Sequence, residues 1–330
     1  DGNSYTFNIL TTDNAGNTQT SACSAGLALD TTNPVAATAI AWAEATPSNN
    51  LTVNANWTVS AAADLASQSI QFYSTGTCVT NSGAPIALGT GVTSQSFTGL
   101  TANTYSFIVS SIDNAGNTQA SACSGAMVLD TDNPTVPVAT NWAEGSIHNA
   151  TTITSRWTLG GSIDVANHRV AYFTDGACGS SAGPTVLKNS TDTTDIFTGA
   201  DGNTYYYTVT AIDNAGNETT TACNTTGILV DTSFPANAST LGWAQVTPYS
   251  GLSVDSTWTL SSAGDIASQN IQYYADGTCT TADGASISLG AAIITHNRAA
   301  TDGSVYSFTI ETIDNATNSS TSACSSSLAI

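Results

Sequence analysis

The sequence YSFIVSSIDNAGNTQASAC, residues 105–123, is one of four copies of the same pattern in a chain of 330 residues. Tyr105, Phe107 and Val109 alternate with Ser and Ile residues, which is the two-residue period of a strand with one buried face. In the central DNAGN, Asn and Gly accept positive φ and Asp caps its own backbone, so the stretch predicts a β-hairpin. The turn begins at Asp13, Asp113 and Asp213, and it returns as DNATN at Asp314.

Three short linkers that end in proline divide the chain: DTTNP at 30–34, DTDNP at 130–134 and DTSFP at 231–235. Internal repeats override the domain count expected from length alone. Residues 1–30 contain only the C-terminal hairpin of an incomplete repeat, so its other strands come either from the chain upstream or from a neighbouring molecule, and we expect the upstream chain. The complete repeats are predicted at 31–130, 131–231 and 232–330.

Within 31–130 the strands can be placed in order. Alternating or β-rich runs predict strands at 40–44, 51–59, 69–73, 84–88 and 93–97, before the hairpin. In 51–59, Val53, Ala55 and Trp57 share one face. Seven short strands separated by Gly, Asn and Ser turns predict an antiparallel β-sandwich.

A tryptophan on the second strand recurs at Trp57, Trp157 and Trp258, and the motif GLTANTYSF precedes the hairpin at Tyr105. This pattern resembles fibronectin type III and bacterial immunoglobulin-like repeats, which build the stalks of large bacterial surface adhesins. The resemblance implies an all-β, tandem array of seven-stranded antiparallel immunoglobulin-like or fibronectin III-like β-sandwiches. It also implies that Tyr105 forms a tyrosine corner, in which its hydroxyl bonds nearby backbone. The matching tyrosines are Tyr5, Tyr205 and Tyr306.

The seven cysteines allow two pairings, one inside each repeat and one across the linkers. The later cysteine of each repeat lies near the exit of its own domain, whereas the earlier one lies at the far end of the next. A strand of six to eight residues spans roughly 20 to 26 Å, and disulfide Cα atoms lie within about 7 Å, so the pairing across the linkers is excluded. The predicted bridges are Cys78–Cys123, Cys178–Cys223 and Cys279–Cys324, with Cys23 left alone.

Composition indicates an extracellular protein. The chain has 4 Lys and Arg against 24 Asp and Glu, a formal charge of −20. A surface this acidic repels phosphate, which makes nucleic acid and anionic membranes poor partners. Three predicted disulfides indicate an oxidising compartment, and no apolar run approaches the eighteen or so residues that a membrane helix needs.

No catalytic constellation is predicted. The histidines His148, His168 and His296 occupy different places in their repeats, and no zinc spacing, phosphate-binding loop or nucleophile motif is present. The close carboxylate pairs, such as Asp192 and Asp195, are interpreted as solvated surface. We therefore expect no enzyme activity and no required cofactor.

A tryptophan also recurs in the first strand, at Trp42, Trp142 and Trp243. An exposed tryptophan near Asp and Asn can stack on a sugar ring, so an alternative function is a carbohydrate-binding module array on a secreted protein. The simpler interpretation is that these rings cover the sandwich edge, because binding sites usually belong to one specialised domain.

Three series of aspartates recur in register, in the linkers, in the loops after the tryptophan strands and in the hairpin turns. Because the loop and the turn lie at the end of the sandwich where the linker arrives, the three series are expected to converge. Turn capping is the ordinary role for such residues, and structural calcium, which prefers carboxylate and carbonyl oxygens, is the alternative. The candidate ligands are Asp13, Asp30, Asp64, Asp113, Asp130, Asp164, Asp213, Asp231, Asp265 and Asp314.

The function predicted from these observations is an extracellular structural repeat segment: the stalk of a bacterial surface adhesin, or an extracellular fibre or filament. Its expected partners are further repeats of the same chain, upstream and downstream. Lateral or head-to-tail self-association and a glycan or cell-surface receptor complete the partner predictions, and nucleic acid is excluded.

Overall fold

The computed structural model describes residues 2–139 and 141–330, which fold into strands and connecting loops. The chain divides into two compact units. The first comprises Asp1–Pro134 with Ile212–Glu218, and the second comprises Thr135–Ala211 with Thr219–Ile330. Among the described residues, no helix has the length and apolar character needed to cross a membrane.

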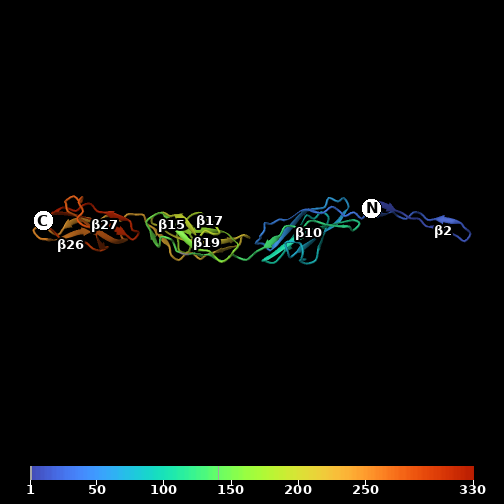
Figure 1. Cartoon of the computed structure of the whole chain (residues 1–330), viewed down its shortest axis with the longest axis horizontal. Coiled ribbons are helices and arrows are strands. Elements are labelled where there is room, and N and C mark those ends of the chain that lie inside the picture. Colours follow the sequence, from blue (N-terminus) through green and yellow to red (C-terminus); the bar gives the residue numbers. More distant parts are fainter. Residues whose placement is uncertain (1, 140) are drawn as a thin grey trace. The chain divides into compact units, whose positions relative to one another are not determined.

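The first unit contains a two-sheet antiparallel sandwich, in which Figure 1 labels β10. One sheet has the order β5-β6-β9 and the other β11-β10-β7-β8, with β12 also paired to β10. The strands are β5 (Thr38–Trp42), β6 (Thr52–Thr58), β7 (Leu65–Tyr73), β8 (Ile86–Leu88), β9 (Ser94–Thr98), β10 (Asn103–Asp113), β11 (Thr118–Ala120) and β12 (Met127–Leu129). Since β11 and β12 are two parts of one interrupted strand, this is the predicted seven-stranded sandwich.

Alternating burial explains why these segments form strands. In β6, Val53, Ala55 and Trp57 are buried while the residues between them are exposed. On β10, Phe107 and Val109 face the same core, where they join Trp57. Apolar side chains on the inner faces of both sheets therefore drive the pairing of the sheets, at roughly 1.5 to 3 kcal/mol for each large side chain buried.

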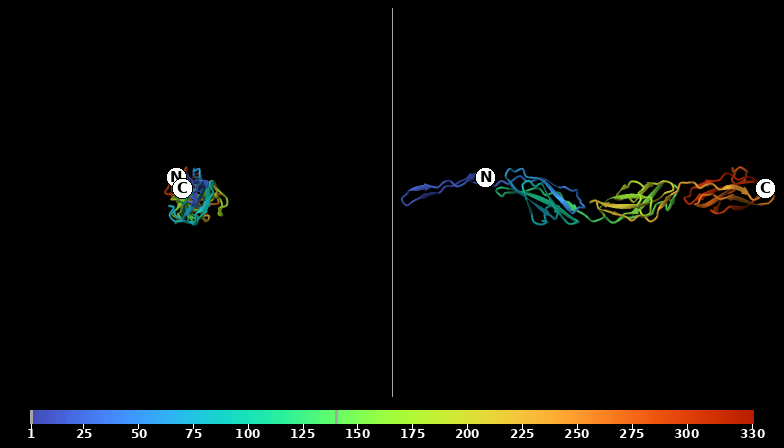
Figure 2. Two further views of the ribbon diagram at one scale, coloured as in Figure 1. Left: turned by 90° about the vertical axis from the view of Figure 1, so that its right-hand side faces the viewer. Right: turned by 180° about the vertical axis from the view of Figure 1, so that it is seen from behind.

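The second unit contains two further sandwiches, coloured green to red in Figure 2. In the first, the sheets are β13-β15-β18 and β14-β21-β19-β16-β17, with β20 paired to β19; in the second, they are β22-β23-β26 and β25-β24-β27-β28, with β29 paired to β27. The strands of the first are β13 (Val138–Ala139), β14 (Ile147–His148), β15 (Thr152–Thr158), β16 (Val165–Phe173), β17 (Val186–Asn189), β18 (Thr194–Thr198), β19 (Thr204–Asp213), β20 (Glu218–Thr220) and β21 (Ile228–Val230). Those of the second are β22 (Ser239–Trp243), β23 (Ser253–Thr259), β24 (Ile266–Tyr274), β25 (Ile287–Gly290), β26 (Thr295–Ala299), β27 (Val305–Asp314), β28 (Ser319–Thr321) and β29 (Leu328–Ala329).

The N-terminal residues form a hairpin without a second layer. In it, β1 (Asn3–Tyr5) pairs with β4 (Leu27–Leu29), and β2 (Leu10–Thr12) pairs with β3 (Thr18–Thr20). All four strands are exposed along their length.

One predicted strand begins earlier than expected, and one strand pairing was not foreseen. The third strand begins at Leu65, not at residue 69, because Leu65 to Ser69 pair with the far half of β10. The short parallel pairing of β14 with β21 was not predicted, because β14 is only two residues long and carries no strand pattern. The interpretation of Asp195 as solvated surface was wrong, because its side chain is buried and accepts a hydrogen bond of 2.8 Å from the Tyr172 hydroxyl.

Three disulfides join the predicted cysteines: Cys78–Cys123, Cys178–Cys223 and Cys279–Cys324, with Cα–Cα distances of 6.0, 5.7 and 5.8 Å. Each closes 45 residues of sequence within one sandwich. Cys23 is free and exposed.

The tyrosine corners are also present in the three sandwiches. The Tyr105 hydroxyl accepts a hydrogen bond of 3.0 Å from the Leu100 N–H, five residues earlier. Tyr205 and Tyr306 accept equivalent bonds from Ala200 and Thr301. Tyr5 lies on the exposed hairpin and is 57% exposed.

Candidate metal centre

Each DNAGN turn is organised by its aspartate. The Asp113 carboxylate accepts hydrogen bonds from the N–H groups of Ala115 and Asn117 and from the Asn117 side-chain amide, all at 2.8 to 2.9 Å. Burial alone would raise the pKa of Asp113, but these bonds hold it below its usual value. The predicted turn-capping role is therefore real, and the capped carboxylate is a buried anion.

The last asparagine of the turn fastens the preceding linker. In the first unit, the Asn117 side-chain amide donates to the carbonyl oxygens of Asp30 at 3.2 Å and Thr32 at 3.3 Å. In the second unit, Asn318 donates to the Asp231 carbonyl at 2.9 Å. One amide thus bridges the turn aspartate and the linker backbone.

The loop after the tryptophan strand completes this junction. The Asn114 N–H donates to the Asp64 carbonyl at 3.0 Å, which fixes the loop against the turn. As a result, Asp30, Asp64 and Asp113 each present a carboxylate oxygen to one point, with the three oxygens within 4.8 Å of one another. Two ligands on opposite sides of a calcium ion are separated by about 5 Å, because Ca–O bonds are about 2.3 to 2.6 Å long. The first trio therefore has dimensions that suit calcium.

The same arrangement recurs in the second unit. Asp231, Asp265 and Asp314 lie within 4.8 Å by the same measure, and the Asn315 N–H donates to the Asp265 carbonyl at 3.0 Å. Burial raises the pKa of Asp231, and the neighbouring carboxylates Asp314, Asp265 and Asp201 raise it further. Ionisation of Asp231 in the folded chain is therefore opposed by burial first and by the neighbouring carboxylates second.

The other four candidate ligands, Asp13, Asp130, Asp164 and Asp213, are divided between the two units. Asp13 is exposed, and hydrogen bonds from Asn17, Ala15 and Gly16 hold its pKa below the usual value, so it caps its turn. Asp130 and Asp213 belong to the first unit, where the Asn217 amide donates both to the Asp130 carbonyl and to the Asp213 carboxylate. Asp164 belongs to the second unit.

Sequence reasoning missed Asn117 and Asn318 as junction residues. A signal was present, because the final Asn of the turn recurs in all four copies, at Asn17, Asn117, Asn217 and Asn318. Asn is common in turns because it tolerates positive φ, but the turn requires positive φ at only one or two positions. The last Asn is not one of them, so its recurrence indicates a contact outside the turn.

The first-strand tryptophans pack against the sandwich core, with Trp142 buried and Trp42 and Trp243 half-buried. Trp42 packs edge-on against Phe107 with ring centroids 5.0 Å apart, and its indole N–H donates to the Gly125 carbonyl at 3.0 Å. Trp243 repeats both contacts, with Phe308 and Ser326, and Trp142 is only 3% exposed. The rings close the sandwich core, which agrees with the simpler of the two interpretations.

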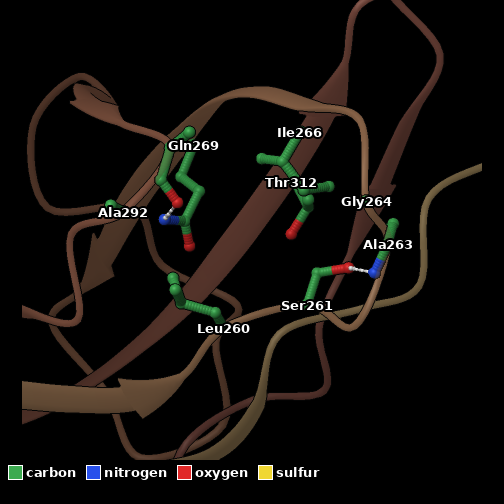
Figure 3. A pocket seen from close by; sticks show the side chains of 9 residues that line it. Leu260, Ser261, Ala263, Gly264, Ile266, Gln269, Ala292 and Thr312 are labelled. Atoms are coloured by element: carbon green, nitrogen blue, oxygen red, sulfur yellow. Dashed lines mark hydrogen bonds between the residues drawn. The ribbon is translucent and has the colours of Figure 1, made fainter.

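A pocket of about 190 Å³ lies in the last sandwich, and Figure 3 shows the side chains that line it. Gln269 is fully engaged there, since it accepts from Trp258 and donates to backbone carbonyls, and Ser261 caps the Ala263 N–H. None of the nine lining residues is an acid, a histidine or a cysteine, so the hydroxyls of Ser261 and Thr312 have no general base beside them among the residues that line this pocket.

Comparison with known proteins adds little. No protein-family model and no curated protein matches the chain. Among solved structures, the crystal structure of the chicken CNTN1 FN1–FN3 domains is similar at 14% sequence identity, covering 88% of this chain and 97% of that chain, with a TM-score of 0.36. Since a TM-score this low does not establish a shared fold, the sandwich assignment is based on the strand pairings described above.

Proposed function

We propose that the chain is an extracellular structural repeat segment, of the kind that forms the stalk of a bacterial surface adhesin or fibre, and that calcium at the aspartate trios stiffens its linkers. Short linkers fastened by side chains to the next sandwich suit a spacer. Three disulfides suit an oxidising exterior.

The observation that carries this proposal is the recurring junction of linker, loop and turn. In both Asp30–Asp64–Asp113 and Asp231–Asp265–Asp314, three carboxylates from distant parts of the sequence meet where the linker is fastened. Carboxylates that repel one another destabilise a junction, whereas a divalent cation between them links the three elements. The junction is therefore where a cation would change mechanical behaviour.

Calorimetry on chelator-stripped protein tests the proposal. A cation that binds only the folded state stabilises it, by about 2.7 kcal/mol when its concentration is 100 times Kd. We expect calcium to raise the melting temperature and to bind at the two trios. Magnesium is expected to act more weakly, because it requires a smaller octahedral site.

Two variants with the same change of charge give the control. D64N removes one ligand of the first trio and is expected to reduce the response to calcium. D132N changes an exposed aspartate outside the trios and is expected to leave that response unchanged. An unchanged melting temperature with calcium in the native chain would leave turn capping as the only role of these residues.

A further inference from the structure

Residues 3–29 reproduce the backbone arrangement of residues 103–129 at an offset of one hundred positions. Tyr5 pairs with Leu27 as Tyr105 pairs with Met127. The Phe7 N–H donates to the Ser24 hydroxyl at 3.0 Å, and the Phe107 N–H donates to the Ser124 hydroxyl at the same distance. The N-terminal hairpin is thus already shaped as the closing hairpin of a sandwich.

The apolar face of this hairpin is uncovered. Phe7 is 67% exposed, whereas its counterpart Phe107 is fully buried. The same contrast holds along the face for Tyr5, Ile9, Leu27 and Leu29, whose counterparts are Tyr105, Val109, Met127 and Leu129. Five large apolar side chains on two neighbouring segments of the hairpin are thus exposed where the complete repeat buries their counterparts, and an apolar face of this kind is suited to a partner.

The complete sandwich of the first unit shows what covers such a face. Phe107 and Val109 lie in one core cluster with Trp57 and Phe72, and Tyr105 lies with Val53 in another. These partners come from β6 and β7, so the covering element is a set of strands and not a single peptide.

The backbone edge of the hairpin identifies the same partner. In the complete sandwich β10 runs without interruption over Asn103–Asp113, because β7 pairs along it. In the hairpin, the corresponding stretch is divided into β1 and β2, and residues 6–9 are not in a strand. Their backbone groups on the side away from residues 21–24 are exposed, and such an edge is a template for pairing with another strand.

A thiol lies beside this edge. Cys23 is free and exposed, and its counterpart Cys123 is bonded to Cys78, which follows β7. The partner strand that completes the hairpin would therefore bring its own cysteine to Cys23.

We propose that residues 2–30 bind a polypeptide segment with the strand pattern of residues 31–100, and that Cys23 forms a disulfide with the cysteine of that segment at the Cys78 position. The segment supplies the two layers of strands that cover Phe7 and its neighbours. On binding, β1 and β2 join into one strand.

The disulfide forms by an ordinary oxidation of two thiols. The two thiols lose two protons and two electrons and form one S–S bond. A low-molecular-weight disulfide, such as oxidised glutathione, accepts the electrons and is reduced to two thiols.

An extended chain tests the proposal. A copy of residues 31–100 is placed directly before Asp1, so that Asp1 and Gly2 take the places of Thr101 and Ala102 and the spacing is preserved. The native chain has one free thiol, and the extension adds a second. We expect the thiol count to fall to zero in a glutathione redox buffer, with a peptide joining Cys23 to the added cysteine in mass spectrometry. Residues 6–9 are expected to gain protection from hydrogen exchange.

Matched variants separate the face from the thiol. F7D in the extended chain places a charge on the apolar face and is expected to abolish the protection, whereas N8D places the same charge on the opposite face and is expected to preserve it. C23S is expected to keep the protection without the disulfide. Two free thiols per extended chain, together with unprotected residues 6–9, would overturn the proposal.

Discussion

At the scale of single residues, the three sandwiches differ in the side chain that lies beside the buried tryptophan of the second strand. In the first unit the Trp57 indole donates to Gln68, whose amide donates to the carbonyls of Gly89, Thr90 and Val92. His168 replaces this glutamine in the next repeat. Its Nδ1 lies 3.3 Å from the Asn189 carbonyl and its ring packs beside that of Trp157. Among the described residues, neither its Nε2 nor the indole N–H of Trp157 has a hydrogen-bond partner, and both are buried.

His168→Gln should therefore stabilise the second unit. The glutamine can accept from Trp157 and donate to the neighbouring carbonyls, as Gln68 does, and each buried polar group that gains a partner is worth about 1 kcal/mol. We expect the free energy of unfolding to rise by about 1 to 2 kcal/mol in urea denaturation. The reverse change, Q68H, should lower it in the first unit, and a loss of stability in both variants would contradict this explanation.

Asp231 makes stability depend on pH. Burial and neighbouring carboxylates raise its pKa in the folded state above the ordinary value of 3.8. Its contribution to stability is therefore fully present below pH 3.8 and is lost as the pH rises through the folded pKa. In chelator, D231N should become progressively more stable than the native chain over this rise.

Calcium should reverse the order of these two proteins, because D231N lacks a charged ligand. D302N, a change at an exposed aspartate outside the trios, provides the control and should follow the native chain. Melting temperatures between pH 3 and pH 7, with and without calcium, measure both effects. If the difference in melting temperature between D231N and the native chain did not change with pH, the ionisation of Asp231 would not be unfavourable in the folded state.

At the scale of elements, each disulfide joins the loop after the third strand to the closing strand. Cys78 has a positive φ of 55°, and its N–H donates to the Ser106 hydroxyl at 3.0 Å. The left-handed conformation recurs at Cys178 and Cys279. A non-glycine residue in this region costs roughly 1 kcal/mol or more, so the loop depends on the bridge and its hydrogen bonds.

Replacing both Cys78 and Cys123 by serine should destabilise the first unit by about 2 to 4 kcal/mol, since a loop of 45 residues is worth about 4 kcal/mol in the chain-entropy model. Calorimetry of the intact chain measures the shift. The transition of the second unit serves as an internal reference, because its two bridges are unchanged. Equal shifts in both transitions would indicate that the units do not unfold independently.

The tyrosine corner offers a smaller effect. Tyr205→Phe removes the acceptor of the Ala200 N–H while leaving the ring in the core. We expect a loss of about 1 kcal/mol in the second unit, measured by urea denaturation. Tyr5→Phe, on the exposed hairpin, is the matched control and should change nothing measurable.

The sequence allowed much of this to be predicted at the element scale, for a physical reason. The inner faces alternate strictly, as at Val53, Ala55 and Trp57, so the strands and the sandwich follow from periodicity. The convergence of Asp30, Asp64 and Asp113 followed from topology. The first residues of β7 were missed because Leu65 and its neighbours form a strand only through pairing with β10. The recurrence of the last Asn of the turn marks Asn117 as a residue with a tertiary role, but its partner in the linker lies 87 positions away, and no local pattern identifies that partner.

At the scale of the whole molecule, charge sets the conditions under which the chain works. A formal charge of −20 with 4 Lys and Arg gives the molecule few cations of its own to neutralise the junction carboxylates. Two of these four pair with carboxylates outside the trios: Lys188 pairs with Asp195, and Arg298 pairs with Asp283. Cations from solution are therefore expected to control how firmly each linker is held.

Calcium bound at the two aspartate trios is expected to restrict the motion of each repeat against the one that follows its linker. Small-angle X-ray scattering of the full chain tests it directly, because free linkers give a broad distribution of interatomic distances and restricted linkers give a narrow one. We expect calcium to narrow the distribution relative to chelator in the native chain, and to have a smaller effect in a D64N/D265N variant that lacks one ligand in each trio. Identical scattering with calcium and with chelator, at a calcium concentration that saturates any binding seen by calorimetry, would contradict the claim.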